Sequence, residues 1–213
     1  MNNFICSTKY IMAKFKIKYG NLIKEKATFI VNASNTQLIL GSGVSKAFRQ
    51  HCGGSSFQQE LYKLKNDFAS IHQGDVILSS SGCATNFTYA LHAIVMNYSD
   101  DSKMPFPSYH HIKQILENIT LLTQQVILEN QINKPKLVIP LLGCGTGGLR
   151  QEKVYLLIKK HFEQSMIKNL EVIVYFFHIK DYLRFLMKQI KKLACSQFTY
   201  PSQTRFFRLH LLT

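Results

Sequence analysis

The sequence contains no apolar run that approaches the roughly 18 residues a membrane-spanning helix needs. Its longest uninterrupted apolar pieces are short, and residues 137–142 are one example. Residues 1–9 also lack the basic start and the apolar stretch of about 7 to 15 residues that mark a secretory signal. We therefore expect a cytoplasmic protein that has no membrane segment and no membrane partner.

Paired metal-ligating residues are missing as well. The five cysteines are odd in number, lie far apart and form no C-x-x-C pair, which argues against a disulfide framework and a structural zinc site. Among the eight histidines only His110 and His111 are adjacent, and neighbouring side chains on a helix point about 100° apart. The sequence thus predicts reduced thiols, no metal site and no cofactor.

Acidic residues are scarce: 12 stand against 26 lysines and arginines, for a net charge of +14. The surplus lies at the two ends, with six basic residues against one acidic in residues 1–28 and twelve against four in residues 150–213. Two interpretations stay open. The lysines could simply solvate helix surfaces, or the basic ends could contact a polyanion such as nucleic acid.

The length of 213 residues and the 46% hydrophobic content favour one domain with a sizeable core. Apolar runs of strand length alternate with stretches of helical period, which is typical of an α/β domain with a largely parallel or mixed sheet. We expect strands at residues 14–19, 27–32, 75–79, 89–95, 136–141 and 171–177, and helices at residues 44–51, 57–65, 108–129, 151–163 and 179–194.

The last predicted helix has the clearest pattern. Its apolar residues repeat at helical spacing and are expected to face the core: Tyr182, Leu183, Leu186, Met187, Ile190, Leu193 and Ala194. The domain is therefore expected to span residues 13–194, with residues 1–12 as an N-terminal extension and residues 195–213 as a basic, aromatic C-terminal tail. Met12 is an alternative start.

Two glycine-rich loops follow buried strands and lead into helices, at residues 32–44 and 143–148. Glycine lets backbone amides approach an anion, and a helix N-terminus adds partial positive charge. Ligands of open α/β sheets bind at the carboxyl ends of the strands. The loops therefore predict a diphosphate site, although either one alone could simply make a tight turn.

Nucleotide motifs of other classes fit poorly. The second loop matches G-x-G-x-x-G, but it comes late in the chain and the next strand ends without a carboxylate, which argues against a nicotinamide oxidoreductase. No G-x-x-x-x-G-K-[ST] is present, so a P-loop is excluded.

Five motifs occur in order along the chain: I-V-N-A-S-N at residues 30–35, G-S-G-V-S-K-A-F at 41–48, G-D-V at 74–76, A-L-H-A at 90–93 and I-P-L-L-G-C-G at 139–145. With these motifs the chain resembles the macrodomain family, and the resemblance extends over residues 13–194. The resemblance implies a three-layer α/β/α domain with a central mixed, mostly parallel sheet. It also implies that ADP-ribose or an ADP-ribosylated protein is the partner.

The resemblance also implies a set of ligand-binding residues: Asn21, Leu22, Ala33, Asn35, Gly41, Ser42, Gly43, Val44, Gly143, Cys144, Gly145, Thr146, Gly147 and Phe177. Within this set, Asn35 matches the family asparagine at the distal ribose and is the candidate catalytic residue. Asn21 replaces an aspartate that accepts the adenine amino hydrogen. Phe177 is expected to cover the adenine, with Phe176 as the alternative, and His92 is expected to be structural.

Catalytic groups of the family are replaced. Ser45 stands where many hydrolases carry an aspartate, Ser42 where another branch carries a lysine, and Gly147 and Leu149 where aromatic residues often wall the distal ribose. Asp75 is the candidate substitute base. Three hypotheses follow: a slow ADP-ribosyl hydrolase that acts on modified protein side chains or small esters, a non-enzymatic ADP-ribose reader, and a polyanion-binding module.

Overall fold

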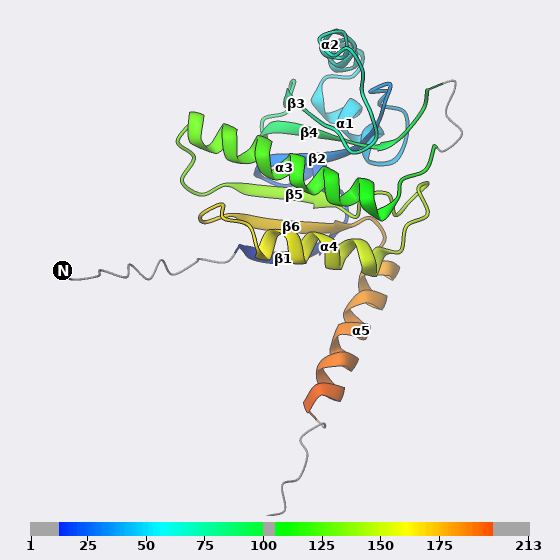
Figure 1. The fold of residues 1–213 in the computed structure, drawn as a ribbon, viewed down its shortest axis with the longest axis vertical. Coiled ribbons are helices and arrows are strands. Elements are labelled where there is room, and N and C mark those ends of the chain that lie inside the picture. Colours follow the sequence, from blue (N-terminus) through cyan, green and yellow to red (C-terminus); the bar gives the residue numbers. More distant parts are fainter. Residues whose placement is uncertain (1–12, 100–104, 198–213) are drawn as a thin grey trace, which may run out of the picture.

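The structure is a computed structural model that describes residues 13–99 and 105–197, with side chains up to residue 191. Six strands form one sheet in the order β1-β6-β5-β2-β4-β3 (Figure 1). The strands are β1 (Lys14–Tyr19), β2 (Ala27–Asn35), β3 (Val76–Ser80), β4 (Phe87–Met96), β5 (Lys136–Pro140) and β6 (Glu171–Phe176). The helices are η1 (Leu22–Lys24), α1 (Gly43–Cys52), α2 (Ser55–Lys65), α3 (Tyr109–Glu129), α4 (Gln151–Glu163) and α5 (Ile179–Gln197).

The sheet is mixed and mostly parallel. Only β3 runs antiparallel, against β4, while β1, β6, β5, β2 and β4 pair in parallel. The predicted elements are confirmed, with ends that move by up to three residues, and α4 has its predicted bounds. β2 continues through residues 33–35, where the polar Ser34 and Asn35 fall outside a prediction based on apolar runs.

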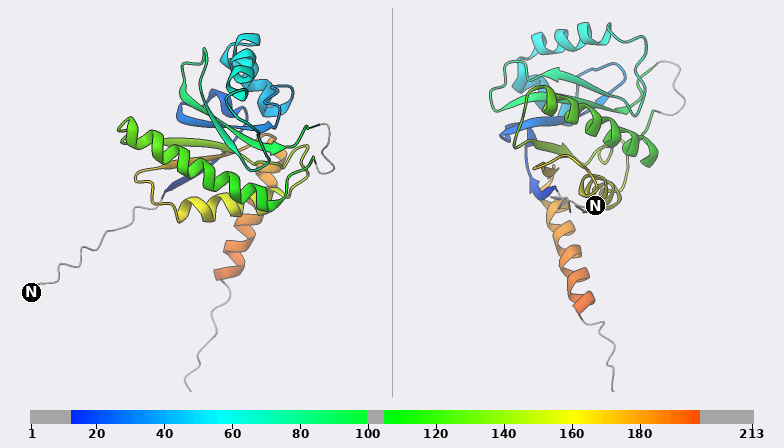
Figure 2. Two further views of the ribbon diagram at one scale, coloured as in Figure 1. Left: turned by 45° about the horizontal axis from the view of Figure 1, so that its top comes forward. Right: turned by 60° about the vertical axis from the view of Figure 1, so that its left-hand side comes forward.

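Helices cover both faces of the sheet, so the expected three-layer α/β/α arrangement is confirmed (Figures 1 and 2). On one face, α1 and α2 bury Phe48, Phe57 and Leu61 against β2 and β4. On the other face, α3 and α4 bury Ile115, Ile119 and other residues against the same sheet. Both faces of the central strands are therefore buried, which explains their continuous apolar character.

The prediction for α5 is wrong for three of the five apolar stripe residues whose side chains are described. Leu183, Met187 and Ile190 are 51%, 58% and 61% exposed, while Phe185 on a different side of the helix is buried. The helix packs only through its first turns and then extends away from the sheet (Figure 1). An amphipathic pattern shows that a helix has an apolar side, but it does not show that the domain covers that side.

The predicted domain boundaries are only partly visible. Residues 1–12 lie outside the described part, as do residues 198–213 of the predicted tail, and α5 crosses the boundary at 194 by continuing to Gln197. The side chains of Leu193 and Ala194 are also outside it. Within the described residues, no helix is long and apolar enough to cross a membrane, and no three histidine, cysteine or acidic side chains form a metal-binding group.

Candidate functional site

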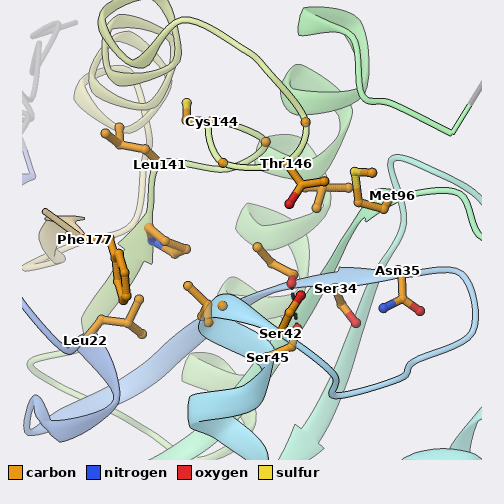
Figure 3. A pocket seen from close by; sticks show the side chains of 18 of the residues that line it. Leu22, Ser34, Asn35, Ser42, Ser45, Met96, Leu141, Cys144, Thr146 and Phe177 are labelled. Carbon is orange, nitrogen blue, oxygen red and sulfur yellow. Dashed lines mark hydrogen bonds between the residues drawn. The ribbon is translucent and has the colours of Figure 1, made fainter. Parts of the chain in front are cut away.

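A cavity of about 460 Å³ opens where β2, β5 and β6 end (Figure 3). β2 and β5 are parallel neighbours, so the loops that follow them leave the same edge of the sheet. From β2 the chain continues to the β4 side of the sheet, while β5 leads to β6 on the other side. Such a switch point is where open α/β sheets bind ligands, and the volume is within the usual range of ligand pockets.

Side chains rather than flexible backbone fix the first loop. The Asn35 side chain accepts hydrogen bonds from Gln37 N and Ile39 N at 3.1 and 3.2 Å and donates to Ile39 O at 2.9 Å. Buried Gln58 of α2 accepts from Leu40 N and donates to Leu38 O. These hydrogen bonds fix the shape in which the loop reaches α1.

The N-terminus of α1 faces the cavity without a side-chain cap. Ser42 is the N-cap residue, but its hydroxyl makes no capping hydrogen bond. The amides in the first turn of a helix have no partner within the helix. Since Gly43, Val44 and Ser45 of this turn line the cavity, their amides are available to an anion there.

The second loop is a tight turn after β5. Cys144 N, Gly148 N and Leu149 N donate to Leu141 O, Gly145 O and Gly143 O respectively. These bonds leave the amides of residues 145–147 without a carbonyl acceptor in the described part of the chain. The two loops therefore present backbone donors to one cavity, as the sequence predicts.

All but one of the predicted ligand-binding residues line this cavity. The exception is Asn21, whose side-chain oxygen accepts from Ile23 N at 3.3 Å and caps η1, although its neighbours Gly20 and Leu22 do line the cavity. Asn35 lines it too, but its amide is largely committed to the loop. This favours a structural role for Asn35 over a catalytic one, and contact of any of these residues with a ligand stays a prediction.

Aromatic and apolar residues form one end of the cavity. Phe177 and Leu22 lie there together (Figure 3), and Phe177 is 67% exposed. Phe176, the alternative, is buried and packs against Phe185. The Tyr175 hydroxyl donates to Glu25 at 2.6 Å. Of these two phenylalanines, Phe177 is therefore the one whose ring could stack on a planar base.

Nearly all of the groups that line the cavity are neutral. No lysine or arginine is among the described residues that line it, and Asp181 at the start of α5 is the one carboxylate among them. Asp181 accepts from Gln151 at 3.0 Å and pairs with Arg184 at 3.4 Å. An anion held here would therefore be bound by backbone amides and not by a cationic side chain.

The surroundings of three further residues explain what each can do: Gly147, Cys144 and Asp75. A Cβ atom on Gly147 would meet Gly143 O at 2.6 Å and Pro107 Cγ at 2.7 Å, so Pro107 fills the space that a side chain would need. Cys144 is no activated nucleophile, because burial raises the pKa of its thiol to about 12. Asp75 lies outside the cavity and accepts from His72 N at 2.7 Å, so it is not the substitute base.

Several cavity residues were not among the predicted ones. Some of them lie at or just after the end of β4, namely Val95, Met96 and Tyr98, and others at or just before the start of α5, namely His178 and Asp181. The pairing of β4 beside β2 places the first three there, and no local motif reveals this pairing. For His178 and Asp181, the sequence signal was that polar residues follow directly after the last strand.

The comparisons with known proteins agree with this geometry. A family model described as Macro domain matches residues 31–158. A macro domain-containing protein of Caldanaerobacter subterraneus subsp. tengcongensis is 22% identical over 173 residues, which cover 79% of this chain and 91% of that protein.

Solved structures share the fold. A mutant of the Oceanobacillus iheyensis macrodomain with ADPR gives a TM-score of 0.67 at 18% identity, over 87% of this chain and 96% of that one. The Trypanosoma brucei macrodomain in complex with ADP gives 0.60 at 17% identity, over 81% and 67%. The family model matches more than half of the residues of the present chain, which therefore belongs to the macrodomain family.

Proposed function

We propose that this protein binds ADP-ribose, free or attached to a protein, in the cavity at the ends of β2, β5 and β6. The observation that carries the proposal is the convergence of two amide-lined loops on a single cavity. Similar macrodomains have been solved with ADPR and with ADP, which supports this choice among diphosphate ligands.

In this proposal the diphosphate lies between the two loops. Amides of α1 and of residues 145–147 donate to its oxygens, and the positive end of the α1 dipole adds to the attraction. The base stacks on Phe177 at the aromatic end. The terminal ribose then extends toward the side where Ser34, Ser42 and Ser45 lie (Figure 3).

Gly145→Val tests the site directly. The backbone at Gly145 is not restricted to glycine, and no atom lies within 4 Å of an added Cβ, so the variant should fold. Its side chain would occupy the space of the diphosphate and should weaken ADP-ribose binding at least about tenfold in calorimetry. Gln50→Val, on the exposed surface of α1, is the matched control and should bind normally. Wild-type protein that ignores millimolar ADP-ribose would contradict the proposal.

Slow hydrolysis of ester-linked ADP-ribose is the second candidate. The Ser45 hydroxyl in the cavity wall favours it, because a hydrogen-bond acceptor there could orient an attacking water. A missing carboxylate base typically lowers the rate by about 10² to 10⁴. Single-turnover assays at high protein concentration separate the two: released ADP-ribose that Gly145→Val abolishes supports a hydrolase, and binding without release supports a reader.

Contact of the basic ends with a polyanion is a separate proposal. It predicts that binding of poly(ADP-ribose) weakens steeply with salt, whereas binding of one ADP-ribose to neutral amides should respond weakly. A flat salt response for both ligands would eliminate it.

A further inference from the structure

A chain of buried polar side chains runs from the cavity wall into the domain. The Ser45 hydroxyl oxygen lies 2.8 Å from Ala33 O and 3.0 Å from Asn32 Oδ1. The Asn32 amide nitrogen lies 3.1 Å from His92 Nδ1, and His92 Nε2 lies 2.9 Å from Ser79 Oγ. Asn32 and His92 are fully buried, so their side chains hydrogen-bond to these protein groups and not to bulk water.

The hydrogen positions in this chain are constrained. Burial lowers the pKa of His92 to about 3, so the ring is neutral and carries one N–H. The Asn32 nitrogen donates to Nδ1, so Nε2 carries the hydrogen and donates to Ser79, whose own hydroxyl donates to Ser80 O at 2.9 Å. Asn32 Oδ1 is then left as an acceptor for Ser45.

The single hydrogen of the Ser45 hydroxyl is therefore kept inside the protein. Both neighbours on the inner side, Ala33 O and Asn32 Oδ1, are acceptors, and a carbonyl oxygen can be nothing else. Toward the cavity, Ser45 can offer only oxygen lone pairs. A serine that is free to rotate would donate or accept as the ligand requires, whereas this one can only accept.

We propose that Ser45 is a specificity-determining hydrogen-bond acceptor for a hydroxyl group of the terminal ribose, and that Asn32 and His92 position it. The inference rests on the proposed ADP-ribose site. Ionised phosphate oxygens are acceptors and would be repelled by this lone pair, so the partner must be a donor. The adenine amino group belongs at the Phe177 end, away from Ser45 (Figure 3), which leaves the sugar hydroxyls.

The test compares ADP-ribose with ADP, which has the same base and diphosphate but no terminal ribose. Ser45→Ala should weaken binding of ADP-ribose about five- to tenfold, the usual effect of one lost hydrogen bond, and change binding of ADP less than about twofold. Ser56→Ala on the exposed surface of α2 is the matched control and should change neither. Equal losses for both ligands, or no loss for ADP-ribose, would overturn the inference.

The positioning role is tested by a double-mutant cycle. His92→Gln should weaken ADP-ribose binding in the wild-type background but add no further loss in the Ser45→Ala background, and it should spare ADP. A merely structural histidine would weaken both ligands, or add its loss in both backgrounds. If His92→Gln does not fold, Ser79→Ala at the outer end of the chain provides the same comparison.

Failure of this inference is distinguishable from failure of the proposed function. Wild-type protein that binds neither ADP nor ADP-ribose contradicts the proposed site itself. Wild-type protein that binds both, with an unselective Ser45→Ala, contradicts only the role of Ser45.

Discussion

At the scale of single residues, Ser34 is an exception to the rule that buried polar groups are hydrogen-bonded. It is 1% exposed, and its hydroxyl has no partner among the described residues, whereas the nearby side chains of Asn32 and Asn35 both have partners. Burial of an unbonded hydroxyl costs about 1 to 3 kcal/mol. A residue that lowers stability beside a ligand cavity is typical of a functional site rather than of a core.

We expect Ser34→Ala to leave the free energy of unfolding unchanged or to raise it by up to about 1 kcal/mol, because it removes a group without a partner. Thr123→Val is the control: its buried hydroxyl donates to Ile119 O at 2.7 Å, so this variant should lose about 1 kcal/mol. Urea unfolding measures both. A loss at Ser34 equal to that at Thr123 would show that the Ser34 hydroxyl has a partner.

The parts of the site that require glycine were predictable, and these are the two glycine loops and their convergence. In the second loop Gly143 and Gly148 adopt a φ of +70°, and Gly147 has no room for a side chain, so the backbone there requires the residue type that the sequence shows. The direction in which a polar side chain bonds was not predictable. Asn21 and Asn35 were assigned to a ligand, but their amides bond to their own loops.

At the scale of elements, α5 shows that the apolar period of a helix need not coincide with the side that packs on the domain. The stripe that contains Leu183, Met187 and Ile190 has the spacing of a core face but is exposed, while Phe185 on a different side of the helix packs against Tyr155 and Phe176. The sequence defines the helix because helical propensity is local. It does not define the buried side, because that depends on how far the sheet extends beneath the helix.

Phe185→Ala should therefore lower the free energy of unfolding by about 3 kcal/mol or more, since a buried aromatic ring is lost. Met187→Gln and Ile190→Gln, in the exposed stripe, should each change it by less than about 0.5 kcal/mol. Denaturant titrations of the three variants measure the contrast. Losses at Met187 and Ile190 as large as that at Phe185 would mean that the stripe is covered in solution.

At the scale of the whole molecule, buried titratable groups couple stability to pH. Burial lowers the pKa of His92 to about 3 and also lowers the pKa of His161 below its ordinary value. Between about pH 6.5 and pH 3 the unfolded chain therefore binds protons that the folded chain does not. The stabilisation is fully present above the ordinary histidine pKa and is lost as the pH falls.

The free energy of unfolding should accordingly decrease from pH 7 to pH 4, with a slope of up to about 1.4 kcal/mol per pH unit from His92 alone. His92→Gln should reduce this slope in chemical denaturation at each pH. An unchanged slope in His92→Gln would contradict the role of His92.

Glu25 acts in the same direction at lower pH. Burial raises the pKa of its carboxyl, but hydrogen bonds from Lys18 and Tyr175 bring the pKa below its ordinary value.

The chain is basic but its cavity is nearly neutral, so association and dissociation of the ligand should depend on different parts of the molecule. With a net charge of +14, the exterior attracts a diphosphate from a distance, and this attraction weakens as salt screens it. The amides that hold the diphosphate carry no net charge and lie in a sheltered cavity, so screening reaches them poorly. Ionic strength would then set how often a ligand arrives, while the fixed loops would set how long it stays.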